Sequence, residues 1–189
     1  MLPGANWTVL SLCRKSDPDR SSKFYEAMKI LGAQGVMGNL DDSPEQTPPN
    51  IKEVEEEILS ILPENEYDLI LTHSIHGEYN KHHRRNEIAE GVINLIEQKR
   101  LKTNKLWVFA YEDGKSAHLP KSTWFADQIM FLPTDIWGKK YELITQTYGF
   151  SKDSCEAKTA PRNESFWAFA SAYGVKEWLK ACSFANSKY

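Results

Sequence analysis

Four of the chain's five histidines lie in residues 72–87, THSIHGEYNKHHRRNE: His73, His76, His82 and His83. Imidazoles in such a group could form a metal site, a general-base site or a polar surface loop. Side chains three positions apart share a helix face, so Tyr79 with His82, or His82 with Arg85, could converge. Adjacent residues point about 100° apart on a helix, so His82 and His83 do not easily share one metal ion. The residues alone leave functional and structural interpretations equally open.

Two acidic segments are further candidates. Asp41 and Asp42 precede Ser43 and Pro44, and their carboxylates could bind a metal or the hydroxyls of a polar substrate. Asp and Ser also begin turns before proline, and for this segment alone a turn is the better interpretation. The same objection applies to the second segment, Asp17-Pro18-Asp19.

Size and composition exclude several classes of protein. The chain has 189 residues, which suits one domain (1–189), and a formal charge of −3, which gives no reason to expect a nucleic-acid partner. No apolar run approaches the roughly 20 residues that span a bilayer, and no signal peptide is evident at the start. We therefore expect a cytoplasmic protein.

The cysteines are few and scattered. Cys13, Cys155 and Cys182 form an odd set without a CxxC pair. This pattern argues against a disulfide framework and against a thiolate zinc site, and it favours a reducing compartment.

Short apolar runs alternate with helical patterns along the chain. Strands are expected at 7–13, 35–40, 67–73, 105–111 and 128–133. Helices are expected at about 24–31, 51–62, 84–98, 137–147 and 164–182. The polar segment 14–22 is predicted to be a loop. This alternation predicts an α/β fold, a Rossmann-like three-layer sandwich with a mainly parallel sheet. Ligands bind such sheets beyond the carboxyl ends of the strands, which fall here near 13–16, 40–43, 72–79 and 111–113.

Several segments, taken in order, resemble the LmbE-like (PIG-L type) N-acetylglucosaminyl deacetylases. The strongest match is THSIHGEYNKHHRRNEIAEGV (72–92), similar to the family's Thr-His…Gly-Glu-Tyr…His-x-x-His segment. The other matches are EAMKILGAQGVMGNLDDSP (26–44), LWVFAYEDG (106–114), and KKYELITQTYGF with RNESFWAF (139–150 and 162–169), which resemble the family's "Lys…Tyr…Glu-x-Phe" ending. Their common order over most of the chain carries the resemblance.

The resemblance implies a zinc-dependent hydrolase that removes an N-acetyl group from an amino sugar, such as N-acetylglucosamine, or from a related small amide. It implies catalytic roles for Tyr79 and His82, with Tyr79 over the reacting group. It implies His83, or else His82, as a zinc ligand. The substrate contacts that it implies are Asp42, Glu78 and Arg85.

The sequence departs from the family pattern in two places. The family's early His-Pro-Asp-Asp motif is absent, and residues 7–13 align best with its second strand, so we expect the first strand, the motif and the next helix to be missing. In an alternative register, residues 7–13 are the first strand and Asp17 replaces the motif's histidine. The second departure is that Arg85 stands at a zinc-ligand position in the ungapped register, and arginine cannot be a ligand.

These departures leave three hypotheses open. The first is a deacetylase with an incomplete metal site in this chain. The second is a non-catalytic relative that binds a carbohydrate or an acidic small molecule. The third, outside the family, is an α/β protein that binds an acidic small molecule through Arg84, Arg85 and the histidines. A missing central strand would expose apolar edges, so we also expect either a homo-oligomer or a rearranged sheet.

Overall fold

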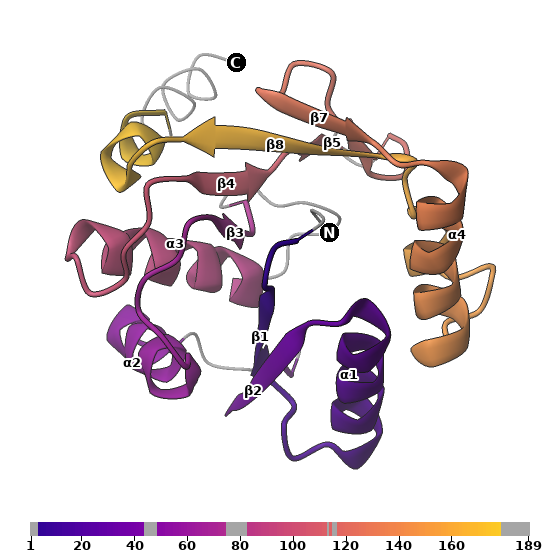
Figure 1. Cartoon of the computed structure of the whole chain (residues 1–189), viewed down its shortest axis with the longest axis horizontal. Coiled ribbons are helices and arrows are strands. Elements are labelled where there is room, and N and C mark those ends of the chain that lie inside the picture. Colours follow the sequence, from indigo (N-terminus) through magenta and orange to yellow (C-terminus); the bar gives the residue numbers. More distant parts are fainter. Residues whose placement is uncertain (1–3, 44–48, 75–82, 113, 115–116, 179–189) are drawn as a thin grey trace.

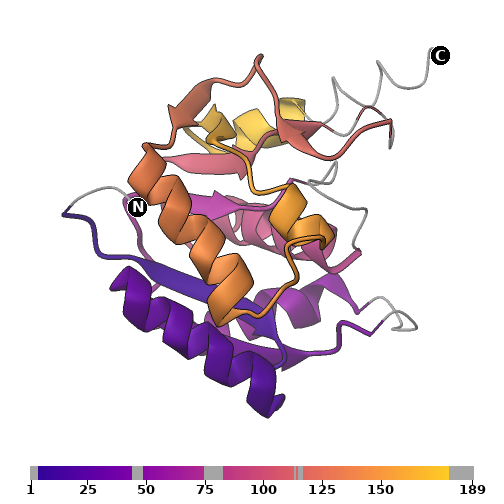
Figure 2. The ribbon, with the colours of Figure 1, turned by 90° about the vertical axis from the view of Figure 1, so that its right-hand side faces the viewer.

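The computed structural model describes residues 4–43, 49–74, 83–112, 114 and 117–178, with the side chain of His83 outside the description. Figure 1 shows strands in the middle of the molecule, with helices α2 (Ile51–Ile61) and α3 (His83–Glu97) on one side. Helices α1 (Pro18–Leu31) and α4 (Thr134–Glu142) lie on the other side, one above the other when seen from that side (Figure 2).

The first unit is a parallel strand–helix–strand. Strand β1 (Thr8–Cys13) pairs with β2 (Gln34–Leu40), and α1 connects them. Helix α1 starts at Pro18, earlier than the sequence pattern predicted. Asp17 caps it by accepting hydrogen bonds from the backbone N–H groups of Asp19 and Arg20, while Pro18 supplies a backbone angle suited to the first turn. The predicted loop at 14–22 is therefore wrong for its second half.

Helix α1 lies unusually close to β2 at Gly35. A Cβ atom there would come within 2.6 Å of Met28 Cγ and 2.7 Å of Phe24 Cε1, so any larger residue would force these side chains, or the helix that carries them, to shift. Phe24 and Met28 are both buried in this contact. Glycine at this position lets α1 cover the strand pair and keeps the first turn of the helix near the strand ends.

The second sheet has four strands in the order β3 (Ile70–Thr72), β4 (Leu106–Phe109), β8 (Asn163–Phe169) and β7 (Gln128–Phe131). Only β3 and β4 are parallel, because β8 runs antiparallel to both of its neighbours. A small antiparallel pair, β5 (Tyr111–Glu112) with β6 (Lys121–Ser122), lies beside it. The fold is thus mixed α/β, and the predicted mainly parallel Rossmann-like sandwich is wrong in its sheet.

The largest error concerns residues 164–182, predicted as helix. Residues 163–169 form β8, and the chain becomes helical only at 172–178. Phe166 of β8 packs its ring 5.4 Å from that of Trp107 and 5.2 Å from that of Phe109 on β4. Aromatic side chains favour such a half-buried sheet surface, and these cross-strand contacts override the local helical pattern.

The strands that the structure describes do not form one continuous sheet. The pair β1–β2 is not hydrogen-bonded to the four-stranded sheet, although Leu12 of β1 and Ile70 of β3 join one hydrophobic core. A rearranged sheet and self-association were the two alternatives expected if a first strand is missing, and both stay predictions.

Helices α2 and α3 close that core on one side. Val54 and Ile58 of α2 are fully buried against α3, where Gly91 leaves room for them. A Cβ atom added at position 91 would lie 3.2 Å from Val54 Cγ1 and 3.3 Å from Ile58 Cδ1. In the part of the chain described, no helix has the length and apolar character needed to cross a bilayer.

A buried hydroxyl on β8 gives a first testable prediction. Ser165 is fully buried, and its Oγ has no hydrogen-bond partner among the described residues. Ser165→Ala removes this unsatisfied group, so chemical denaturation should show the free energy of unfolding rising by about 1 kcal/mol. Ser122→Ala is the matched control, because Ser122 is equally buried but accepts a hydrogen bond from Asn163, and it should lower stability. A Ser165→Ala protein less stable than the native chain would contradict this account of β8.

Candidate functional site

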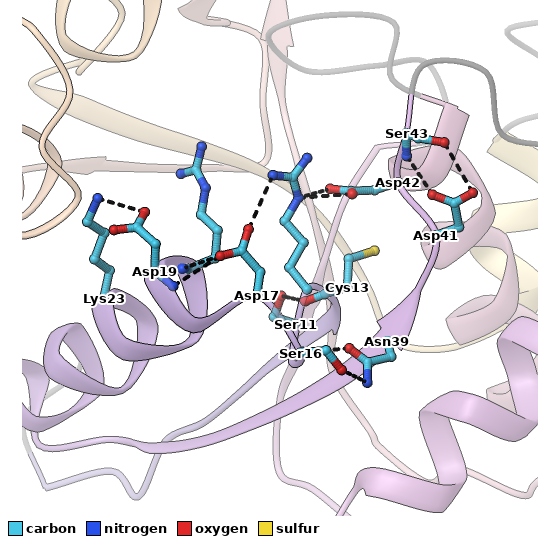
Figure 3. Close-up of polar contacts among 12 residues, drawn as sticks. Ser11, Cys13, Ser16, Asp17, Asp19, Lys23, Asn39, Asp41, Asp42 and Ser43 are labelled. Atoms are coloured by element: carbon cyan, nitrogen blue, oxygen red, sulfur yellow. Dashed lines mark hydrogen bonds and ion pairs between the residues drawn. The ribbon is translucent and has the colours of Figure 1, made fainter.

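Polar side chains gather beyond the carboxyl ends of β1 and β2 (Figure 3). Arg14, directly after β1, donates from Nε to both carboxylate oxygens of Asp42, at 2.9 and 2.7 Å. Asn39 and Ser16 join the two strand ends through hydrogen bonds of 2.7 Å each. These contacts fix the position of Asp42, which the sequence predicted as a substrate contact.

Arg14 is held in an unfavourable backbone conformation. Its φ of 64° lies in the left-handed region, which residues with a Cβ atom rarely adopt. Strain of this kind concentrates at functional sites, where the surrounding contacts maintain it. Here the ion pair with Asp42 and the strand-end hydrogen bonds are those contacts.

The neighbouring Asp41 forms the turn that the sequence favoured. Its carboxylate accepts hydrogen bonds from the backbone N–H of Ser43, at 2.9 Å, and from the Ser43 hydroxyl, at 3.1 Å. These bonds hold the pKa of Asp41 below its usual value. Asp41 therefore shapes the segment that carries Asp42.

Arg84 ties this segment to the start of α3. Its guanidinium donates to the Asp41 carbonyl, at 2.9 Å from Nε, and forms an ion pair with Glu87 at 2.5 Å. The side chain of Arg84 is only 4% exposed. A buried arginine thus joins the end of β2 to α3, one residue before Arg85.

Two cavities open next to these strand ends. The smaller, of about 140 Å³, is lined by Ser11, Cys13, Arg14, Arg20, Phe24, Met37, Asp42 and Tyr148. The larger, of about 410 Å³, is lined by Arg20, Arg85, Lys140, Ile144, Tyr148, Phe150, Cys155, Glu156, Thr159 and Ala160. Arg20 and Tyr148 line both, so we treat the two cavities as one groove. The larger cavity has the size of a small-molecule site.

A π-helical turn supplies one wall of the groove. Segment η1 (Leu143–Thr147) continues α4, and Tyr148 N–H bonds to the carbonyl of Leu143, five residues back, at 2.9 Å. Such wide turns occur often at functional sites. Burial raises the pKa of the Tyr148 phenol, so its hydroxyl stays protonated and can donate a hydrogen bond.

Lys140 is held at the opposite end of that wall. Its ammonium group contacts the carboxylate of Glu164 on β8, and the Tyr111 hydroxyl donates to the same carboxylate. These contacts join α4, β8 and β5, and the short helix α5 (Cys155–Lys158) completes the wall with Cys155 and Glu156. The wall is therefore built by residues far apart in the sequence.

The sequence-predicted site residues divide into two groups. Asp42 and Arg85 lie in the two adjoining cavities of one groove. Glu78, Tyr79 and His82 lie outside the described residues, and His83 begins α3 with its side chain outside the description. Asp17, the histidine substitute in the alternative register, serves as the cap of α1.

The described residues do not fit a zinc ion. No group of three or more His, Cys, Asp or Glu side chains is placed to hold a metal among the residues the structure describes. The Asp42 carboxylate pairs with Arg14, and burial raises the pKa of the neighbouring Cys13 thiol. Zinc in proteins is held by several His, Cys, Asp or Glu donors together, so the predicted zinc would depend on the two histidines and on donors beyond the description.

Reactivity of the thiols gives a second prediction. Burial, together with the negative charge of Asp42, raises the pKa of Cys13 to about 11, whereas Cys155 is exposed in the groove wall. Iodoacetamide near neutral pH should therefore modify Cys155 well before Cys13, as followed by mass spectrometry of peptides. Equal rates at the two cysteines would contradict the placement of Cys13.

The same pKa shift predicts how stability changes with pH. The folded-state pKa lies above the ordinary value of 9.0, so the contribution of Cys13 is fully present below pH 9.0 and is lost as the pH rises to about 11. Cys13→Ser should reduce this loss in denaturation curves measured across that range.

Comparison with protein-family models and with curated proteins finds no match. The structure is similar to the crystal structure of GalB, the 4-carboxy-2-hydroxymuconate hydratase from Pseudomonas putida KT2440. The TM-score is 0.54 and the identity 16%, over 86% of this chain and 83% of the hydratase. At this identity the similarity shows a shared fold.

Sequence reasoning missed Arg20, Lys140 and Tyr148 as groove residues. A signal for the last two exists, because Lys140, Ile144 and Tyr148 are four residues apart and line one cavity. Lys140 and Tyr148 also fall within the segment that resembles the "Lys…Tyr" ending. Nothing local in the sequence marks Arg20, since only the packing of α1 against η1 brings it to the groove.

Proposed function

We propose that this chain is an enzyme that hydrolyses, or adds water to, a small polar organic substrate held in the groove. The observation that carries the proposal is that one groove, beyond the carboxyl ends of β1 and β2, contains both Asp42 and Arg85. The fold shared with a hydratase, an enzyme named for adding water to its substrate, supports the same reaction class.

The groove residues have distinct roles in this proposal. Asp42, oriented by Arg14, accepts a hydrogen bond from a substrate hydroxyl or amide. Tyr148 donates one from its protonated phenol, and Arg85 binds a polar group in the larger cavity. Tyr79 and His82 remain predicted catalytic groups, and Glu78 a predicted substrate contact.

As the specific reaction we propose N-deacetylation of an amino sugar or a related small amide. Water adds to the acyl carbon and the C–N bond breaks, which leaves acetate and a free amine. The support is the resemblance of residues 26–44 and 72–92 to the deacetylase segments. Zinc at His83, or at His82, belongs to this part of the proposal.

The second candidate function is binding without catalysis. The observation in its favour is that the described residues bring together no group of three or more His, Cys, Asp or Glu side chains that could hold a metal. In this case the same groove holds a carbohydrate or an acidic small molecule and releases it unchanged.

Turnover and metal content together decide between the two candidates. The purified chain, supplied with zinc, is incubated with N-acetylglucosamine, and the released amine is measured along with bound zinc. The enzyme proposal expects amine release, stoichiometric zinc and loss of that zinc in His83→Ala. Native protein with neither amine release nor stoichiometric zinc would discard N-deacetylation and leave the binding function.

Asp42→Ala tests whether turnover uses this groove. Loss of one charge-assisted hydrogen bond to the substrate should lower kcat/KM by roughly 10- to 100-fold. Asp19→Ala is the matched control, because Asp19 forms an ion pair with Lys23 on α1 and does not line the groove. Equal activity of the two variants would place the reaction elsewhere.

A further inference from the structure

The larger cavity is positively charged in a chain that is negatively charged overall. Among the described residues that line it, three are cations, Arg20, Arg85 and Lys140, and one is a carboxylate, Glu156. The whole chain carries a formal charge of −3. Cations concentrated in a concave site attract an anionic ligand.

The cations differ in how they are neutralised. Lys140 forms an ion pair with Glu164, so its charge is largely compensated. Arg20 forms no ion pair with any carboxylate that the structure describes; its guanidinium lies 5.6 Å from the centre of the Phe150 ring. Since Arg20 also lines both cavities, it is placed to contact a ligand at their junction.

The other residues that line the larger cavity suit the carbon skeleton of an organic molecule. Ile144 and Phe150 present apolar surface, and Tyr148 combines an aromatic ring with a protonated hydroxyl. A ligand that fills this cavity would bury carbon atoms against these side chains while its charged group reaches Arg20.

The balance of charge favours a carboxylate over a phosphate. The planar guanidinium binds both groups well, so the geometry of arginine does not separate them. Glu156 in the wall, and Glu164 beside Lys140, reduce the excess positive charge and repel a second negative charge. Over the described lining residues, these carboxylates make a group of charge −1 a better match than a dianionic phosphate.

We propose that the larger cavity recognises the carboxylate of a small organic acid, with Arg20 and Arg85 as the contacts to the carboxylate and Ile144, Tyr148 and Phe150 against its carbon body. The proposal rests on the proposed function only in taking the groove as the substrate site. Among the amino sugars and small amides of that function it favours those that bear a carboxylate, and it makes Arg20 a determinant of specificity.

The test compares three probes of similar shape by isothermal titration at low ionic strength and near neutral pH. They are 3-phenylpropionate, its neutral amide, and phenyl phosphate. We expect one saturable site for the acid, with the amide and phenyl phosphate each at least about tenfold weaker. Equal binding of acid and amide, or tighter binding of phenyl phosphate, overturns the proposal.

Variants then locate the recognition. Arg20→Leu should weaken binding of the acid about tenfold, and Arg20→Lys should restore part of the affinity because it keeps the charge. Lys139→Met is the control, because Lys139 is exposed next to Lys140 and lies outside the cavity lining. Circular dichroism checks that each variant is folded. A folded Arg20→Leu protein with unchanged affinity overturns the role of Arg20.

The outcome is separable from that of the proposed function. If the chain binds the acid at this site but releases no amine from any amide, the carboxylate proposal stands and the enzyme proposal fails. If the chain deacetylates an uncharged sugar and shows no preference for the acid, the enzyme proposal stands and the carboxylate proposal fails.

Discussion

Arg84→Met is expected to lower the free energy of unfolding by about 3 kcal/mol. Arg84 is almost completely buried, and it donates to the Asp41 carbonyl while pairing with Glu87. Methionine keeps much of the apolar stem but leaves a carbonyl and a largely buried carboxylate without this partner. Urea denaturation of the native chain and the variant measures the loss.

The matched control is Arg100→Met. Arg100 pairs with Glu56 through a comparable ion pair of 2.7 Å, but both side chains are exposed to solvent. Exposed ion pairs contribute little to stability, so this variant should unfold at nearly the native urea concentration. If the two variants were equally stable, Arg84 would not be the link between β2 and α3 that we describe.

Arg84→Met should also affect the site. The Asp41 carbonyl that Arg84 holds belongs to the residue before Asp42, which lines the smaller cavity. Loosening this segment should weaken ligand binding in the groove even where the variant is fully folded. Such an effect separates positioning of the site from general loss of stability.

Ile58→Ala is expected to lower the free energy of unfolding by about 3 to 4 kcal/mol. Ile58 has no exposed surface, and it packs between α2 and α3 in the larger hydrophobic core. Truncation removes buried methyl and methylene groups and leaves a cavity. Because α2 and α3 already lie close together at Gly91, this cavity could close only if one of the helices moved. Thermal and chemical denaturation both report this loss.

Ile30→Ala provides the comparison, since Ile30 is an isoleucine of similar helical context on α1 but is 56% exposed. Its truncation should cost well under 1 kcal/mol. A small effect at Ile58 would mean that α2 does not close the core as described.

Most secondary-structure elements could be predicted from the sequence, because their signals are local. The apolar run at 7–13 and the amphipathic pattern at 51–62 correspond closely to β1 and α2. The expectation that polar residues at strand ends would form a site follows from the same patterns. For the segment with Asp42 those patterns alone favoured a turn, and the family resemblance supplied both Asp42 and Arg85 as substrate contacts; both residues line the groove.

The rest depends on contacts between distant segments. Residues 163–169 form a strand because β4 and β7 pair with both of their edges, and no local pattern specifies that pairing. Arg20 reaches the groove because α1 packs against the π-turn after α4, more than a hundred residues later in the chain. The start of α1, by contrast, has a local signal in the sequence. Asp17 before Pro18 is a typical helix start, and the prediction of a loop at 14–22 overlooked it.

The groove as the substrate site is tested most directly by a two-dimensional amide NMR titration with 3-phenylpropionate. We predict saturable shifts clustered around Arg20, Tyr148 and Thr159, on both walls of the groove, and their loss in Arg20→Leu. Shifts confined to a distant surface, such as the exposed Trp124, Phe125 and Phe131, would contradict the groove as the ligand site, and the absence of saturable shifts would contradict its preference for a carboxylate.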